Sequence, residues 1–308
     1  MSSTDLRNRL VQSLSKSINE LSISNNGEQL KNKFICPICL KIFDLNECLN
    51  SGDIISLEDI PPKSLGGHPL TITCKNCNNS CGHNLDIYLF NEIKKGCIIP
   101  LSGKEMQKGT ISNGSTTLQG QISVDVYNKI ISVKIDEKNN NPSNIDTLNS
   151  DLKKAFESRI PANFQMNFTE LKRCPEVLST ALLKNAYLLA FHTFGYRYIL
   201  QSNLDIVRIQ ILFPQQKILS INPIIFLNER SLQNFDDGVY KVSIEDQLCI
   251  GVIFTLNMKE INIAYQIFAV LPDFNDKKSR IYSEVFGHGI TKVSIIAKYK
   301  KINQYNET

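Results

Sequence analysis

Apolar residues fall on one face of a helix in two parts of the chain. Near the N-terminus they recur every three or four positions between Ser, Arg, Lys and Asn, at Leu6, Leu10, Val11, Leu14, Ile18 and Leu21. The stretch from Pro175 to Leu200 is apolar over a broader face and is interrupted by Gly195. We expect a helix in each stretch, and Gly195 is where the second would break.

The N-terminal helix lies within residues 1–30, and Ser3, Thr4 or Asp5 can cap its start. A single amphipathic face indicates only that something covers it. The helix therefore either packs on its own protein or docks a protein partner or a second copy of the chain.

The second half of the chain is dominated by short runs rich in Val, Ile and aromatic residues, which are typical of strands. A short helix is expected over Leu152–Arg159, and polar residues rich in Gly, Ser and Thr over 106–122 predict a linker. Residues 123–308 would form a mixed, β-rich domain of the α+β class with one or two long helices. The expected strands are Val124–Val126, Ile130–Ile135, Val207–Phe213, Ile218–Leu227, Val239–Ile244, Leu248–Leu256, Ile261–Leu271 and Val293–Tyr299.

Composition is that of a protein with an ordinary core, with 42% hydrophobic and 21% charged residues over 308 positions. A net charge of +4 permits nucleic-acid binding without arguing for it, because phosphate affinity depends on where Lys and Arg cluster. No apolar run approaches the length of a membrane span or a signal peptide. We expect a cytoplasmic protein that does not associate with membranes.

Nine cysteines include two Cys-x-x-Cys pairs, Cys36 with Cys39 and Cys74 with Cys77. Each pair presents two thiolates to one ion, and two pairs complete the tetrahedral shell of a structural zinc site. A redox dithiol and a coincidence of spacing are the alternatives. The scattered cysteines are expected to be small buried apolar residues: Cys48, Cys81, Cys97, Cys174 and Cys249.

Between and after these pairs, the sequence resembles the HNH endonucleases that carry a zinc knuckle. That family's pattern is an acidic residue, His, two residues, Pro, three residues and Gly-Gly, followed by Cys-x-x-Cys and then His or Asn. The resemblance covers about fifty of the 308 residues. Its matching segments are Cys36-Pro37-Ile38-Cys39, Glu58-Asp59-Ile60-Pro61-Pro62-Lys63-Ser64-Leu65-Gly66-Gly67 and Cys74-Lys75-Asn76-Cys77-Asn78.

The resemblance implies a β-hairpin followed by a helix, a ββα-metal module of the treble-clef-like kind. Such a module holds one divalent cation, Mg²⁺ or Mn²⁺, against the scissile phosphate. Glu58 and Asn78 map to its ligands, and Asp59 stands where the family has its His base. The family's middle Asn, which orients that base, would fall near His68 or Pro69, where this chain has no Asn.

Asp59 is the main departure from the family. A carboxylate is a weaker base than imidazole, so the exchange would cost roughly ten- to a hundredfold in rate. Asp59 could instead bind the metal, leaving His68 or His83 as the base. The alternatives are a turn or helix cap for Glu58 and Asp59, and two ordinary surface histidines.

Together these observations predict a zinc-bound nuclease module over residues 31–105, with residues 123–308 recognising a substrate or partner. The expected function is metal-dependent cleavage of phosphodiester bonds in DNA, and a role in defence against foreign DNA fits the family. The alternative is a catalytically degraded module on the same zinc frame that binds DNA or protein.

Overall fold

The computed structural model describes residues 2–25, 28–98, 107–125, 130–158, 165–168, 174–227, 235–258, 263–276, 281–282 and 293–299. The chain divides into two compact units, and each is described by itself. Unit 1 comprises Met1–Glu92 and Cys174–Thr308, and unit 2 comprises Ile93–Arg173. Unit 2 is therefore an insertion in the sequence of unit 1.

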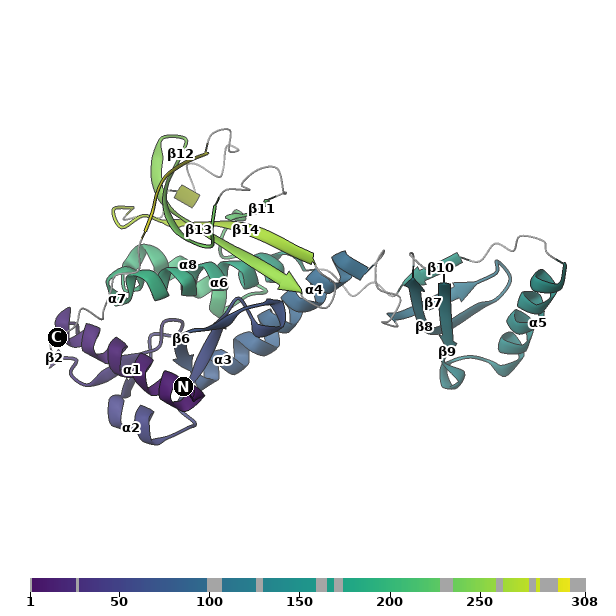
Figure 1. Ribbon diagram of the computed structural model, residues 1–308, viewed down its shortest axis with the longest axis horizontal. Coiled ribbons are helices and arrows are strands. Elements are labelled where there is room, and N and C mark those ends of the chain that lie inside the picture. Colours follow the sequence, from purple (N-terminus) through teal and green to yellow (C-terminus); the bar gives the residue numbers. More distant parts are fainter. Residues whose placement is uncertain are drawn as a thin grey trace. The chain divides into compact units, whose positions relative to one another are not determined.

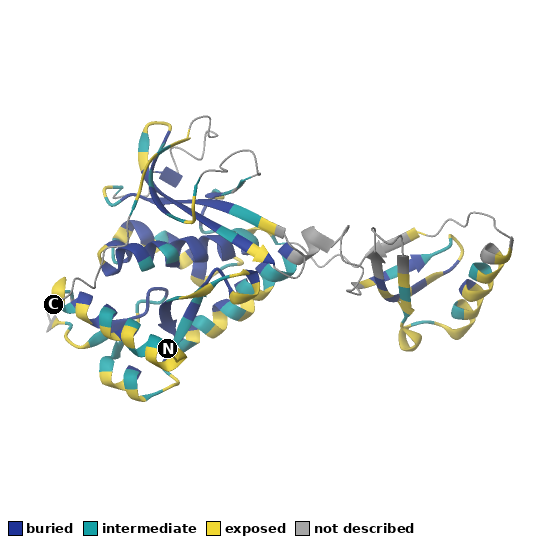
Figure 2. Cartoon of the chain, viewed as in Figure 1, coloured by how far each residue is buried: buried dark blue, intermediate teal, exposed yellow. Residues whose placement is uncertain are grey.

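Helix α6 (Pro175–Phe194) is the centre of unit 1. It begins with Pro175, whose fixed φ suits the first turn, and ends at Gly195, which has a positive φ of 64°. Its sequence is apolar nearly all round, and such a helix must be covered on every side. Accordingly α6 contacts a five-stranded sheet on one side and the cysteine-containing segment on the other (Figure 1), and most of it is buried (Figure 2).

The five-stranded sheet of unit 1 is antiparallel, in the order β11-β14-β13-β12-β15. Its inward residues from β12, β13 and β14 are almost all fully buried, and they pack on α6. The strands are β11 (Ile224–Leu227), β12 (Gly238–Ile244), β13 (Gln247–Met258), β14 (Ile263–Pro272) and β15 (Val293–Lys298).

The N-terminal part of unit 1 contains the four paired cysteines and three short antiparallel strand pairs. The elements are α1 (Ser3–Glu20), β1 (Ser24–Asn25), β2 (Glu28–Gln29), β3 (Lys33–Ile35), β4 (Ile42–Asp44), α2 (Leu45–Asn50), β5 (Ile55–Ile60), β6 (His68–Cys74), α3 (Lys75–Cys81) and α4 (Ile87–Ile98). Strand β5 pairs with β6, and α3 follows β6 directly. This succession of two strands and a helix is the order that the resemblance implies.

Unit 2 is a four-stranded antiparallel sheet, β10-β7-β8-β9, with one helix packed on it. Its elements are β7 (Gln107–Ser112), β8 (Thr117–Asp125), β9 (Ile130–Ile135), α5 (Pro142–Ser158) and β10 (Gln165–Phe168). Ile111, Leu118 and Leu148 form its small core.

The expected domain boundaries differ from the structure. Strands β7 and β8 run through 106–122, so that segment is not a linker. The predicted nuclease module (31–105) and recognition domain (123–308) are also not separate, because α6 packs on both the hairpin and the large sheet. The pattern of apolar and polar residues could not reveal that unit 2 is inserted within unit 1, because an insertion has no characteristic sequence signal at its two ends.

The strand expected at Val207–Phe213 is also wrong, because this segment forms helix α8 (Asp205–Leu212). A short apolar run fits either period, and tertiary contacts decide between them. Here Val207 and Ile211, four residues apart, are buried, and Arg208 forms an ion pair with Asp205 one turn earlier.

Other expectations are confirmed. Helix α1 forms, but its cap is Ser2, one residue before the expected candidates, and Asp5 completes a capping box from the first turn. The long helix breaks at Gly195 and continues as the short α7 (Tyr196–Ile199). The overall class is mixed α and β. None of the described helices has the length and apolar character that a bilayer crossing requires.

Candidate metal centre and buried charge network

The four paired cysteines converge on one point. Their sulfur atoms all lie within 4.8 Å of one another, and the sulfurs of Cys39 and Cys74 are 3.7 Å apart. Zinc–sulfur bonds of about 2.3 Å in a tetrahedron require sulfurs roughly 3.8 Å apart, so the cluster fits a zinc ion. Among the described residues, this is the group of His, Cys, Asp and Glu gathered closely enough to hold a metal.

The four thiols shift one another's pKa values. The contact with Cys36 lowers the pKa of Cys74 to about 7 and the pKa of Cys39 far below its ordinary value. Burial raises the pKa of Cys36. The contacts with Cys36, Cys39 and Cys74 raise the pKa of Cys77, so the four close thiols hold their protons unequally. Zinc binds the thiolate form and would displace these protons.

Of the remaining cysteines, Cys48, Cys81 and Cys249 are buried as expected. Cys174 is half-buried, and its thiol lies 3.6 Å from the carboxylate of Glu176. The side chain of Cys97 lies outside the part of the chain that the structure describes.

The β5–β6 hairpin changes register between Glu58 and Asp59. Glu58 pairs with Thr71 and Asp59 with Pro69, so Leu70 is an extra residue on β6. Bulges of this kind re-aim side chains next to them. The Leu70 carbonyl leaves the ladder and lies 2.6 Å from Nδ1 of His192 on α6, which fixes the bulge to the central helix.

Lys184 of α6 is the partner of Glu58. Its Nζ lies 2.7 Å from Oε1 of Glu58 and 2.8 Å from both carboxylate oxygens of Asp86. The lysine side chain is 0% exposed, that of Glu58 is 4% and that of Asp86 is 19%. A buried charge requires such partners, so one ammonium joins the central helix to the hairpin and to the turn after α3.

The charged groups in this network shift one another's pKa values. Burial alone would lower the pKa of Lys184, but the carboxylates of Glu58 and Asp86 outweigh it and raise that pKa above its ordinary value. Burial raises the pKa of Asp86, and the Lys184 charge opposes that rise. Lys184 is therefore a permanent cation at physiological pH.

Asn78 lies on α3 and faces Glu58. Its Nδ2 donates to Oε2 of Glu58 at 2.8 Å and to the Leu57 carbonyl at 3.1 Å. Two acceptors fix which way the amide points. Thr73 also donates to Oε2 of Glu58, at 3.3 Å. Both oxygens of Glu58 are thus engaged, and the Oδ1 of Asn78 points away from them.

Asp59 is partly exposed beside this network. Burial, followed by the nearby Glu58 charge, raises the pKa of Asp59, whereas Lys63 and His68 oppose the rise. His68 is exposed at the start of β6. His83 is exposed in the π-helical turn Gly82–Asp86 and has no hydrogen bond to Glu58, Asp59 or Asn78 among the described residues.

The positions of these side chains show which of them could bind the expected divalent cation. Glu58 does not fit the role of ligand, because its oxygens are taken by Lys184, Thr73 and Asn78. The carboxylate of Asp59 and the Oδ1 of Asn78 remain, and both are hard oxygen donors of the kind that Mg²⁺ and Mn²⁺ prefer.

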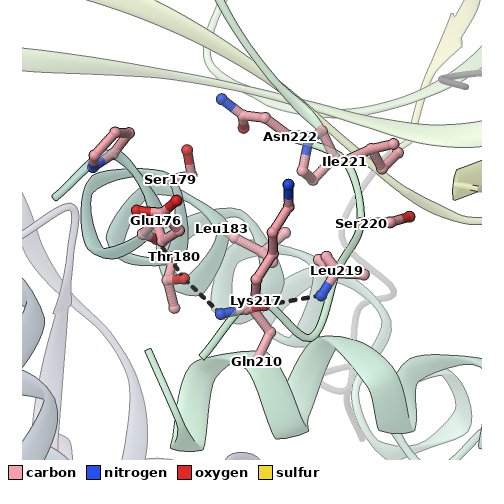
Figure 3. A pocket seen from close by; sticks show the side chains of 12 residues that line it. Glu176, Ser179, Thr180, Leu183, Gln210, Lys217, Leu219, Ser220, Ile221 and Asn222 are labelled. Atoms are coloured by element: carbon pink, nitrogen blue, oxygen red, sulfur yellow. Dashed lines mark hydrogen bonds between the residues drawn. The ribbon is translucent and has the colours of Figure 1, made fainter. Parts of the chain in front are cut away.

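Two hollows lie elsewhere in unit 1. One, of about 200 Å³, lies between the start of α6 and the segment after α8, where Gln210 holds Thr180 and the Leu219 amide (Figure 3). Glu176 and Lys217 bring opposite charges to its rim, so it has no net charge to attract a phosphate. The other, of about 110 Å³, lies beside Cys77 and is lined partly by α3.

Comparison with protein-family models, with curated proteins and with solved structures finds no match for this chain. The site must therefore be interpreted from its own geometry. Sequence reasoning missed Lys184, although the signal was present. It is a charged residue inside an otherwise apolar helix, and a buried lysine nearly always has an acidic partner.

Proposed function

We propose that the chain is a metal-dependent endonuclease of the HNH type that hydrolyses phosphodiester bonds in DNA. The observation that carries the proposal is the 2.8 Å contact between Glu58 on β5 and Asn78 on α3. The two residues that the family resemblance assigns to the cation site thus meet across a hairpin and a helix. The cysteine cluster at the start of α3 supports the frame that holds them.

In this proposal Asp59 and Asn78 hold the cation, and Glu58 positions Asn78. A carboxylate that accepts from a ligand's amide group orients the ligand, as outer partners do in metal sites. One carboxylate is sufficient protein charge for Mg²⁺ when substrate phosphates complete its shell. When bound, the cation would stabilise negative charge on the leaving oxygen.

His68 is the base in this proposal. It is exposed and pairs across the hairpin with Ile60, the residue after Asp59, so solvent and a phosphate can approach it. Imidazole is the side chain most often used for proton transfer near neutral pH. His83 has no comparable link to Asp59.

A catalytically degraded module that binds DNA or protein is the second candidate. Two observations favour it: Glu58 is buried with both oxygens engaged, and an Asp stands where the family has its His base. This candidate keeps the zinc frame and predicts binding without cleavage.

Plasmid nicking with Mg²⁺ or Mn²⁺ separates the two candidates. We expect wild-type protein to nick DNA, and Asp59→Asn and Asn78→Ala to lower the rate at least about a hundredfold, because each removes a cation ligand. Asn79→Ala is the matched control, since Asn79 is the next residue on α3 and is exposed. Equal cleavage by all variants would contradict the site. Binding of single- or double-stranded DNA without cleavage would favour the second candidate.

A further inference from the structure

The Lys184 ammonium contacts the carboxylate of Glu58, which the HNH resemblance assigns to the cation. Its Nζ is within hydrogen-bonding distance of three carboxylate oxygens, two from Asp86 and one from Glu58. The side chain arrives from α6, about a hundred residues further along the chain than Asp86. The ammonium therefore bridges strand β5 of the hairpin and the π-helical turn Gly82–Asp86, which follows α3 directly.

Each oxygen of Glu58 already accepts at least one hydrogen bond. An ionised carboxylate has about four lone-pair directions, and Lys184, Thr73 and Asn78 occupy three of them. The residue is 3% exposed, so water does not supply further partners from bulk solvent. A divalent ion could reach Glu58 only at the remaining lone pair of Oε1, next to the Lys184 ammonium.

A divalent ion at Glu58 would have to displace the Lys184 ammonium, because both carry positive charge. A divalent ion bound to Oε1 of Glu58 at its usual distance of about 2.0–2.6 Å would lie within roughly 5 Å of the ammonium. The lysine is fully buried, so its charge is screened little by solvent. The two cations would repel each other strongly.

We infer that Lys184 is a built-in cation that excludes divalent metal from Glu58 and Asp86. Removing its ammonium should turn these two carboxylates into a site for Mn²⁺ or Mg²⁺. In the context of the proposed nuclease, on which this part of the inference rests, Lys184 is a positioning residue that holds Glu58 against Asn78. The exclusion itself is a property of the unliganded protein and holds for either candidate function.

Mn²⁺ binding without nucleic acid tests the inference, by electron paramagnetic resonance of free and bound ion on the full chain. We expect Lys184→Ala to bind one Mn²⁺ at least about tenfold more tightly than wild type, because two buried carboxylates then lack a counter-charge. Lys184→Ala/Asp86→Asn should lose the gained site. Lys184→Met should not gain it, since the methionine side chain fills the space.

A surface pair supplies the matched control. Lys33 lies 3.1 Å from Asp44, and both are 36% exposed. Lys33→Ala removes a lysine from a single exposed carboxylate and should gain no Mn²⁺ site. Folding of each variant is checked by zinc content and near-ultraviolet circular dichroism.

Two results would overturn the inference. One is a folded Lys184→Ala protein that binds Mn²⁺ no better than wild type. The other needs no variant: a crystal of wild-type protein soaked in Mn²⁺ with an anomalous peak between Glu58 and Asp86. Absence of nicking by wild type would count against the proposed nuclease and would leave the Mn²⁺ result unchanged.

Discussion

Single residues in the interior of unit 1 are held in one protonation state by burial. Tyr187, Tyr196 and Tyr198 are fully buried, and burial raises the pKa of each phenol above its ordinary value. Their hydroxyls donate to the carbonyls of Pro37, Ile35 and Pro272, so they join α6 and α7 to the cysteine segment and to β14. The phenols must stay neutral in the folded protein.

This arrangement predicts loss of stability in alkali. Above about pH 10 the unfolded chain releases phenolic protons that the folded chain retains, so the free energy of unfolding falls as pH rises. Lys184 acts in the same direction, because its pKa is higher in the folded chain than in the unfolded chain. Its contribution to the free energy of unfolding is therefore complete below the unfolded-state pKa of about 10.5. It is lost as the pH rises through the folded-state pKa.

Tyrosinate absorbance and far-ultraviolet circular dichroism, recorded together against pH, check the prediction. We expect exposed tyrosines to ionise first and the buried ones to ionise together with the loss of helix. Ionisation of all tyrosines in one gradual step, with the fold intact, would contradict it.

At the scale of elements, the β5–β6 hairpin depends on the close approach of its own backbone. A Cβ on Gly67 would lie 1.5 Å from the Pro61 carbonyl oxygen, inside the loop that joins the strands. The strands would have to separate to admit it, and Glu58 and Asp59 lie on the first of them. Gly82 differs, because nothing lies within 4 Å of the same position there.

We therefore expect opposite results from two glycine substitutions. Gly67→Ala should lower the free energy of unfolding by about 3 kcal/mol or more, or prevent folding, because backbone must move. Gly82→Ala, at a helical φ of −55°, should change stability by less than about 1 kcal/mol and in the stabilising direction. Urea unfolding measures both, and a Gly67→Ala protein as stable as wild type would contradict the hairpin geometry.

The cysteine cluster is the other determinant at this scale, because it joins the loop after β3 to the junction of β6 and α3. Cys39→Ser should abolish zinc binding and lower the free energy of unfolding by several kcal/mol, since structural zinc and folding are coupled. Cys174→Ser, which changes a half-buried cysteine outside the cluster, should keep the zinc. Zinc content and thermal unfolding check both, and full zinc content in Cys39→Ser would contradict the ligand assignment.

At the scale of the whole molecule, unit 2 interrupts unit 1 along the chain and has a small core of its own. The amide of Cys174, where the chain re-enters unit 1, donates to the hydroxyl of Tyr88, just before the chain leaves it. The two ends of the interruption are therefore close together, as insertions into a stable domain require.

Replacing residues 93–173 with a short Gly/Ser linker should thus leave unit 1 folded and zinc-bound. A small effect on stability is expected, because loop-closure entropy depends weakly on loop length. Zinc content and a cooperative thermal transition are the measurements. A protein that loses zinc or unfolds gradually would show that unit 1 needs unit 2. Unit 2 alone, with a core of few residues, should be of marginal stability.

The sequence by itself determined what depends on neighbours along the chain. Cys-x-x-Cys spacing predicted the cluster, periodicity predicted α1, α6 and most strands of the large sheet, and Gly195 predicted where α6 ends. The resemblance implied that Glu58 and Asn78 share a site; the two are a hydrogen-bonded pair, and their role as cation ligands stays a prediction. Each of these features is set by local spacing, which the sequence displays directly.

Tertiary structure alone decided what depends on distant partners. The short apolar run predicted as a strand forms helix α8, because tertiary contacts decide between the two periods. The segment predicted as a linker forms strands of the inserted unit. Above all, Lys184 contacts Glu58 from more than a hundred residues away in the sequence and occupies the carboxylate that the family resemblance assigns to a metal. A buried charge must find its counter-charge wherever the fold supplies one, and no local pattern states where that will be.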